Sequence, residues 1–294
     1  MKILLLGSSG QLGQAFQELA NSSAFPIGWE MKAWSRGDAD LSNPPELIKK
    51  IQIEKPDLII NTAAYTQVDL AEKERTLCET INAQAPGYIA SYCVDANIPL
   101  IHYSSDYVYA GEGVEPHVES ENHAPGNYYG QTKAEGDALL QKSGCEHLIF
   151  RTSWVFSHVG KNFVKTMLRI GVDRPELRVV SDQVGSPSYA PDLAAYSLEA
   201  LMRALELKAE GKEFPSGVYH LTNSGNTSWA GFAEAILPKN KIIGIPSSEY
   251  PTPAKRPQNS RLSLEKLKQT FGITPRPWQE ALKECLVRLG EQNG

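Results

Sequence analysis

The chain has 294 residues and a formal net charge of −5, from 29 basic and 34 acidic residues. This length exceeds that of most single cores and predicts a main domain with a second, smaller lobe. No basic tail or long charge run occurs, which excludes nucleic acid and anionic membranes as expected partners. No stretch approaches the roughly 20 apolar residues of a membrane span, and the apolar run 3–6 is too short for a signal peptide.

The cysteines indicate a cellular compartment. Cys78, Cys93, Cys145 and Cys285 are scattered along the chain without the spacing of metal ligands. Such a pattern is typical of reduced thiols, so we expect a cytoplasmic protein.

In the first half of the chain, apolar runs alternate with segments of helical period. The predicted strands are 3–6, 31–34, 58–61, 100–104 and 147–155. The predicted helices are 11–20, 44–53, 77–96 and one that contains 133–141. This alternation predicts an α/β fold, a Rossmann-like doubly wound parallel sheet covered by helices on both faces. Right-handed crossovers then bring the carboxyl ends of the strands to one edge, where ligands bind.

The second half is less regular. The predicted helices are 159–171, 192–207, 229–237 and 278–289, with strands at 178–180 and 218–221 and a proline-rich loop system at 246–257. We expect residues 1–155 to form the dinucleotide-binding domain, rejoined by parts of 188–225. The segments 156–187 and 226–294 are expected to form the smaller C-terminal lobe, which would bind the substrate.

A glycine-rich turn follows the first predicted strand. Gly7, Gly10 and Gly13 are spaced three apart, and Gln11 and Leu12 open the next helix. Such a turn lets backbone N–H groups approach a pyrophosphate, and the helix dipole favours the anion. The alternative is a tight strand–helix turn with no ligand, but the position directly after a strand favours dinucleotide binding.

The residues that follow the second predicted strand bear on the choice of cofactor. Arg36 stands where an arginine can hold a 2′-phosphate, which favours NADPH over NADH, unless Arg36 is a solvated surface charge. Asp40 and Leu41 could contact the adenine, or Asp40 could cap the helix that begins at Pro44.

The third predicted strand ends in small residues. Ala63 and Ala64, followed by Tyr65, would let a cofactor lie across the strand end. Small residues also suit close packing between a helix and a strand, so this alternative stays open.

The strongest chemical signal is the pair Tyr129 and Lys133. Residues four apart share one face of a helix. An ammonium beside a phenol lowers the phenol pKa, so Tyr129 could give a proton to a developing alkoxide, and Lys133 could hold the nicotinamide ribose. Ser105 ends the fourth strand region, where its hydroxyl could polarise a substrate carbonyl. The alternatives are an exposed aromatic with a solvated lysine, and a polar turn capped by Asp106.

Together these residues resemble the extended short-chain dehydrogenase/reductase family. The similarity is greatest to its branch that reduces the C4 ketone of dTDP-linked 6-deoxy-4-ketohexoses, such as dTDP-4-dehydro-6-deoxy-L-mannose. It covers nearly the whole chain, at 7–13, 40–44, 61–66, 68–69, 71–72, 104–108, 129–133, 148–155, 162–163, 182–187, 250–254, 256–257 and 259–262.

The resemblance implies roles for individual residues. Tyr129 would donate the proton, Lys133 would orient the ribose, and Ser105 stands where the family usually has threonine. Asp106 lies where the family contacts substrate, and Trp154 would stack on the sugar or cover it.

Three further positions resemble the lining of the nucleotide-sugar site. They are Asn162, Gln183 and Arg256, and the guanidinium fork of Arg256 suits a pyrophosphate. The structural alternatives are a core position for Trp154, a helix cap for Asn162 and a surface charge for Arg256.

One departure concerns metal. Some members of the family bridge a dimer with Mg²⁺ through acids, one of them on the first helix. This chain has Ala15 at that position, so we expect no metal site and leave monomer and homodimer open.

Two other functions remain as alternatives. The first is a nucleotide-sugar epimerase or 4,6-dehydratase with bound NAD⁺, although dehydratases typically place an acid where Tyr107 stands. The second is a non-catalytic partner subunit similar to the regulatory β subunit of methionine adenosyltransferase, because fold does not fix function. The combined presence of Ser105, Tyr129, Lys133 and Trp154 favours an enzyme.

Overall fold

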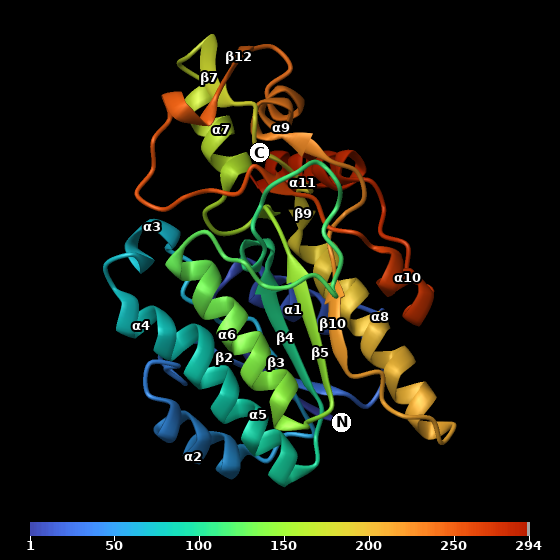
Figure 1. Cartoon of the computed structure of the whole chain (residues 1–294). Helices are drawn as coiled ribbons and strands as arrows, with labels where there is room; N and C mark the ends of the chain where they lie inside the picture. Colours follow the sequence, from blue (N-terminus) through green and yellow to red (C-terminus); the bar gives the residue numbers. More distant parts are fainter. Residues whose placement is uncertain (293–294) are drawn as a thin grey trace.

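A six-stranded parallel sheet forms the centre of the computed structural model, which describes residues 1–292 (Figure 1). The strands run in the order β2-β1-β3-β4-β5-β10. Their bounds are Lys2–Leu6 (β1), Glu30–Trp34 (β2), Leu58–Asn61 (β3), Leu100–Ser105 (β4), His147–Thr152 (β5) and Gly217–His220 (β10). The chain order reverses between β1 and β3, as in doubly wound sheets. The predicted fold class is confirmed.

Helices bury both faces of this sheet, which explains the uninterrupted apolar runs of the strands. One face packs against α1 (Gln11–Ala20), α8 (Ala190–Ala209) and α10 (Glu265–Phe271). The other packs against α2 (Pro44–Glu54), α5 (Ala85–Ala96) and α6 (Tyr128–Ser143). The side chains of 3–6 in β1 are fully buried between these two layers.

The predicted helix 77–96 contains a π-helical turn. It consists of α4 (Arg75–Glu79), a π turn (Thr80–Gln84) and α5, and the short α3 (Val68–Ala71) precedes it. Pro86 has no N–H to donate to the carbonyl of Asn82, which favours such a turn. A Cβ on Gly136 of α6 would lie 2.2 Å from that carbonyl oxygen. The close contact fixes α6, the helix that carries Tyr129 and Lys133.

The second half builds a smaller layer above the carboxyl edge of the sheet (Figure 1). A third apolar cluster joins α7 (Phe163–Gly171), α9 (Trp229–Ile236) and α11 (Trp278–Gln292). The paired strands here are β7 (Glu176–Val180) with β12 (Lys241–Ile245), β6 (Val155–Phe156) with β9 (Ser188–Tyr189), and β8 (Val184–Gly185) with β11 (Thr227–Ser228) and β13 (Asn259–Ser260). Within residues 1–292, no helix has the length and apolar character needed to cross a membrane.

Several helices and strands begin or end at residues other than those predicted, and each difference has a local cause. The predicted helix 159–171 begins at Phe163, because the side chain of Asn162 caps it by accepting the N–H of Lys165 at 3.1 Å. The predicted strand 147–155 ends at Thr152, because Trp154 adopts a left-handed φ of 49°. The helix around 133–141 begins at Tyr128, capped by the Asn127 side chain.

Candidate active site

The glycine turn joins β1 to α1 where the strand order of the sheet reverses. Gly7 has φ +86°, and a Cβ there would lie 2.7 Å from the backbone nitrogen of Ala63. A Cβ on Gly13 would lie 2.1 Å from the carbonyl oxygen of Gly7. Gly10 is the N-cap of α1 and gives it no side-chain cap, so the first amides of the helix, at Gln11 and beyond, are left for an anion. The turn therefore fits a dinucleotide pyrophosphate.

Gly13→Ala tests this packing. The methyl group would collide with the Gly7 carbonyl and displace the turn, so we expect binding of NADPH to weaken by about tenfold or more, equal to 1.4 kcal/mol. Titration of NADPH fluorescence measures the change. Gly290→Ala is the control, because a Cβ there meets nothing within 4 Å. Unchanged binding in Gly13→Ala would contradict the assignment of this turn.

The loop after β2 contains Arg36, which was expected to favour NADPH over NADH. The Arg36 side chain is exposed, with its guanidinium 3.8 Å from the carboxylate of Asp40. Asp40 accepts the N–H of Ser42, whereas the cap of α2 is Asn43. The alternative of Asp40 as the helix cap is therefore wrong, because Asn43 lies directly before the first helical residue. Leu41 is buried in the apolar cluster under the sheet.

At the end of β3, only part of the predicted set faces the glycine turn. Ala63 contacts Gly7 through its backbone, as described above. The Tyr65 hydroxyl instead donates to Glu74 at 2.6 Å, and burial with this bond raises the pKa of Tyr65 to about 12. The neighbouring Thr62 hydroxyl donates to the carbonyl of Leu6, which ties the ends of β1 and β3 together.

Ser105 and Tyr129 lie together at the carboxyl edge of the sheet. Ser105 ends β4, and its hydroxyl is close enough to the Tyr129 phenol to lower the pKa of that phenol. The rings of Tyr107 and Tyr129 meet edge to face, with centroids 5.4 Å apart. A Cβ on Gly130 would lie 2.1 Å from the Tyr107 carbonyl oxygen, so glycine lets α6 approach this closely. Two elements distant in sequence thus bring one hydroxyl and one phenol to a single point.

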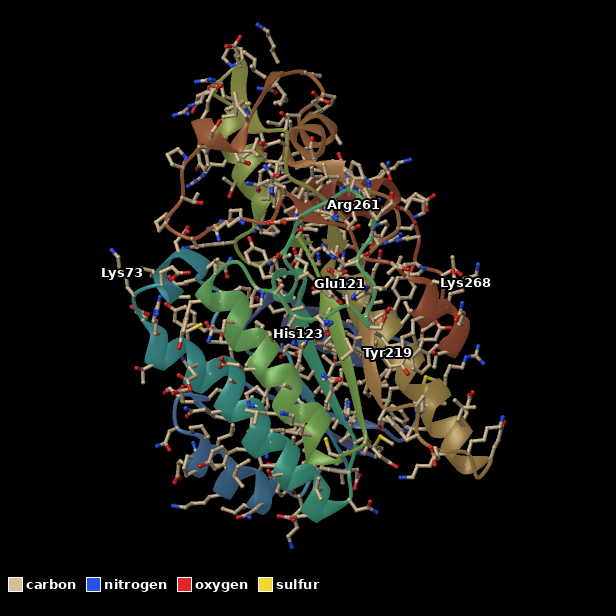
Figure 2. All side chains as sticks on the ribbon, in the orientation of Figure 1. Lys73, Glu121, His123, Tyr219, Arg261 and Lys268 are labelled. Atoms are coloured by element: carbon tan, nitrogen blue, oxygen red, sulfur yellow. The ribbon has the colours of Figure 1, made fainter. Side chains whose placement is uncertain are left out.

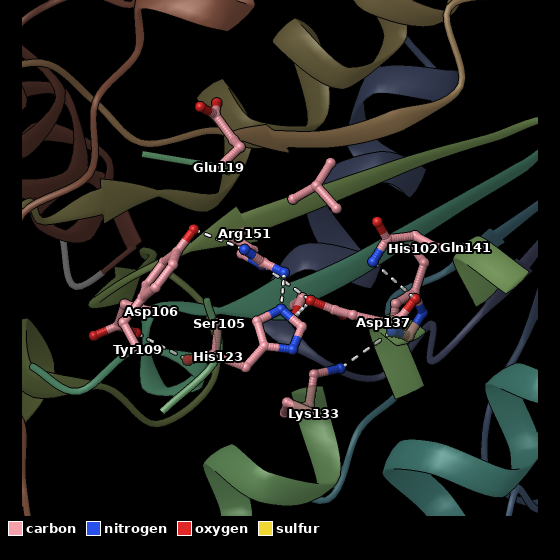
Figure 3. A network of polar contacts seen from close by, with 12 residues as sticks. His102, Ser105, Asp106, Tyr109, Glu119, His123, Lys133, Asp137, Gln141 and Arg151 are labelled. Atoms are coloured by element: carbon pink, nitrogen blue, oxygen red, sulfur yellow. Dashed lines mark hydrogen bonds and ion pairs between the residues drawn. The ribbon is translucent and has the colours of Figure 1, made fainter. Parts of the chain in front are cut away.

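Lys133 lies beneath this point and is 1% exposed. Its Nζ donates to the carbonyl of Tyr103 at 2.7 Å and lies 3.2 Å from Nε2 of His102 (Figure 3). Burial lowers the pKa of Lys133 to about 8. Burial also raises the pKa of Tyr129, although the Ser105 hydroxyl lowers it. The prediction that Lys133 would bring the pKa of Tyr129 below its usual value is therefore wrong for this arrangement, because the ammonium is bonded elsewhere.

Asp106 is buried beside Ser105. Its Oδ1 accepts the Ser105 hydroxyl at 2.8 Å, while its Oδ2 has no hydrogen-bond partner. The Ser260 hydroxyl is close enough to lower the carboxyl pKa but does not form a bond of normal geometry. Burial is the larger effect and raises the pKa of Asp106 to about 6. Asp106 is therefore a buried carboxylate whose ionised form is destabilised, at the carboxyl edge of the sheet.

Because burial destabilises the ionised form of Asp106, the effect of Asp106→Asn on the free energy of unfolding should depend on pH. The folded pKa of about 6 exceeds the unfolded value of 3.8, so ionised Asp106 destabilises the fold fully above pH 6 and not at all below pH 3.8. We expect Asp106→Asn to increase the free energy of unfolding by about 2 kcal/mol more at about pH 8 than at about pH 4. Urea unfolding at both pH values measures it. An equal increase in the free energy of unfolding at the two pH values would show that burial does not destabilise ionised Asp106.

The Trp154 indole stacks on Trp229, a residue that no sequence motif singled out. The ring centroids are 3.6 Å apart and the planes differ by 11°. Gly185 lies against the same indole, since a Cβ there would be 2.8 Å from Cε2 of Trp154. Trp229 thus holds Trp154 from one side, at the left-handed backbone position of Trp154.

The remaining predicted substrate contacts lie in three places. Nδ2 of Asn162 donates to Oε1 of Gln11 at 2.8 Å, so this helix cap also contacts the glycine turn. Arg256 bonds to Asp69 at 2.6 Å and lies beside the Tyr107 phenol. Gln183 instead donates to the Ser247 hydroxyl within the upper layer.

Some family members have a metal-binding acid on α1 where this chain has Ala15, and the Ala15 side chain is buried. The acid one turn further along α1, Glu18, is already paired with other side chains. Glu18 bonds to Nε2 of His158 at 2.9 Å and to Arg288 at 3.0 Å. Across residues 1–292, no group of three or more His, Cys, Asp and Glu side chains is placed to hold a metal ion.

A glycine turn at the switch point, a serine at the end of β4 and a Tyr–Lys pair on α6 define the class of the short-chain dehydrogenases and reductases. A family model described as "RmlD substrate binding domain" matches residues 1–290, and the chain belongs to this family. The family resemblance seen in the sequence is confirmed.

Known relatives match over nearly their whole length. The chain is 40% identical to the dTDP-4-dehydrorhamnose reductase of Burkholderia thailandensis, over 99% of this chain and 100% of the relative. The enzyme of that name from Escherichia coli K12 is also 40% identical, over 98% of each chain. Among solved structures, the dTDP-4-dehydrorhamnose reductase of Bacillus anthracis in complex with NADP is 32% identical, with a TM-score of 0.87 over 98% of this chain and 99% of that one.

Proposed function

We propose that the protein reduces the C4 ketone of dTDP-4-dehydro-6-deoxy-L-mannose to give dTDP-L-rhamnose. The observation that carries this proposal is the meeting of the Ser105 hydroxyl and the Tyr129 phenol at the same edge of the sheet as the glycine turn. The names of the relatives support the substrate, and the NADP complex of the Bacillus anthracis protein supports the cofactor. We take NADPH as the reductant, with NADH as the alternative.

The geometry suits proton donation to a ketone. Bound NADPH supplies a hydride to the carbonyl carbon. The Ser105 hydroxyl would turn from Asp106 to donate a hydrogen bond to the carbonyl oxygen, and Tyr129 would transfer its phenolic proton to the same oxygen as negative charge develops there. Because burial raises the pKa of Tyr129, the phenol stays protonated before the reaction. Lys133 lies one helical turn away, where it can turn to a ribose hydroxyl.

The upper layer would hold the nucleotide sugar. We assign this role to 156–187 and 226–294, and the dinucleotide-binding role to 1–155 with parts of 188–225. Trp154, held by Trp229, offers an indole to the sugar. Arg256 would turn from Asp69 to the pyrophosphate, because a guanidinium fork matches phosphate oxygens. Asn162, Asp106 and Gln183 complete the proposed lining.

A turnover assay tests the proposal. Oxidation of NADPH or NADH is followed by absorbance with dTDP-4-dehydro-6-deoxy-L-mannose, and dTDP-glucose, which lacks the ketone, is the control. We expect stoichiometric oxidation with the ketone alone. Conversion of the sugar without consumption of reduced cofactor would favour the epimerase alternative. No conversion with either cofactor would overturn the proposal.

A further inference from the structure

The segment 254–257 of the upper layer passes above α3 and is bonded to two elements of the first domain (Figure 1). The backbone N–H of Ala254 donates to Oδ1 of Asp69, on α3, at 3.1 Å. The carbonyl of Lys255 accepts a hydrogen bond of 2.7 Å from Nδ2 of Asn127, the N-cap of α6. The backbone of the segment is therefore held at two successive residues.

The Arg256 side chain of this segment is held by the same carboxylate. Its Nη2 donates to Oδ2 of Asp69 at 2.6 Å, while Oδ1 of Asp69 accepts the N–H of Ala254. The Arg256 side chain is 21% exposed and the Asp69 side chain is 40% exposed, so an anion from solvent can approach the pair. If the guanidinium turned away, only the bond to Oδ2 would break. Arg256 can therefore change its partner while the backbone of the segment stays in place.

A pyrophosphate and the Asp69 carboxylate compete for the same cation. Carboxylate and phosphate oxygens both match the fork of a guanidinium. The bond between Arg256 and Asp69 runs through one nitrogen, Nη2, and an ion pair at a partly exposed site is weak. A pyrophosphate offers more oxygens and more charge than one carboxylate, so it can displace Asp69. The broken ion pair and the repulsion from the released carboxylate both lower the affinity of the site for the pyrophosphate.

We propose that Asp69 is an internal competitor for Arg256, whose guanidinium it holds until the pyrophosphate of the nucleotide sugar displaces it. The inference rests on the proposed function, in which Arg256 binds that pyrophosphate. The product carries the same pyrophosphate as the substrate, so Asp69 also takes the guanidinium back when the product leaves. Asp69 acts through Arg256 and is a positioning residue.

A second ion pair on the segment provides a matched control. Nζ of Lys255 lies 3.7 Å from the carboxylate of Glu112, and both side chains are exposed. Glu112→Gln therefore removes one negative charge and one ion pair from the same segment, as Asp69→Asn does, but leaves the bond between Asp69 and Arg256 intact. An effect of net charge alone would appear in both variants.

Calorimetric titration of the full-length protein with dTDP tests the competition. The amide oxygen of Asp69→Asn can still accept the Ala254 N–H, but the charge that holds Arg256 is lost. We expect Asp69→Asn to lower the Kd of dTDP by about threefold or more, and Glu112→Gln to change it by less than about 1.5-fold. Thymidine, which has no phosphate, should bind equally to all three proteins. Unchanged or weaker binding of dTDP to Asp69→Asn would overturn the proposal.

A double-mutant cycle with Arg256→Met shows whether Asp69 acts through the guanidinium. Arg256→Met should weaken the binding of dTDP by about tenfold or more. Adding Asp69→Asn to Arg256→Met should then change the Kd by less than about 1.5-fold, because no guanidinium is left to release. An equal gain with and without Arg256 would show a direct effect on the ligand and overturn the proposal. Binding of dTDP to Arg256→Met at full affinity would remove the assignment of Arg256 to the pyrophosphate, and the inference with it.

Steady-state kinetics distinguish this role from damage to the fold. Asp69→Asn should lower KM for the ketosugar by about threefold without raising kcat, because substrate and product are both held more tightly. A variant with a damaged site would instead show a raised KM, and that result would overturn the proposal. If the unchanged protein reduces no ketosugar, the proposed function fails, while the dTDP titrations still decide the role of Asp69.

Discussion

Tyr129→Phe is expected to lower kcat by about 10²- to 10⁴-fold, the usual contribution of a positioned acid. The variant keeps the ring that packs edge to face on Tyr107 and loses only the phenolic hydroxyl beside Ser105. Binding of NADPH and the free energy of unfolding should therefore change little. Turnover of the ketosugar, fluorescence titration of NADPH and urea unfolding measure the three quantities.

The neighbouring Tyr128 provides a matched control. It lies on the same helix, and its hydroxyl makes only a 3.4 Å contact with Glu79, on the side of α4. Tyr128→Phe should keep kcat within about threefold, since a long bond at a partly exposed site contributes little. If Tyr129→Phe retained the activity of Tyr128→Phe, the proton would come from another group, and the assigned role of Tyr129 would be wrong.

The sheet, and the edge at which its strands end, could be predicted because they depend on local patterns. The buried strands are continuous apolar runs, and handed crossovers fix where they end. The spacing of Tyr129 and Lys133 also placed both on one helix face. It could not say where the flexible lysine would point, because its partners His102 and Tyr103 come from another element.

The upper layer was harder to predict, because its contacts are distant in sequence and its strands are short. Two-residue strands such as β8 and β11 carry no period that a sequence pattern could reveal. The stack of Trp154 on Trp229 likewise joins residues that no spacing rule relates. The Asp40 interpretation failed for a different reason. Two acceptors lie before α2, and the backbone geometry, rather than composition, selects Asn43 as the cap.

Arg151→Met is expected to lower the free energy of unfolding by about 3–5 kcal/mol, the usual cost of leaving a buried charge unpaired. Arg151 is 1% exposed and its Nε donates to Asp137 at 2.9 Å. Its other nitrogens bond to the Tyr109 hydroxyl and to His123 (Figure 3). The loop after β4 carries both of these residues, and His123 and Glu121 lie on it in front of the central strands (Figure 2). Loss of Arg151 therefore releases this loop as well as α6.

Two further variants separate the charge from the packing. Arg151→Met combined with Asp137→Leu also removes the carboxylate that loses its partner, so we expect much of the lost stability to return. Arg178→Met removes an exposed arginine that pairs with Glu249 and should change stability by less than about 0.5 kcal/mol. Urea unfolding at about pH 7 compares all three. If the double variant were as unstable as Arg151→Met, the loss would come from the bonds to Tyr109 and His123, and the loop rather than the ion pair would depend on Arg151.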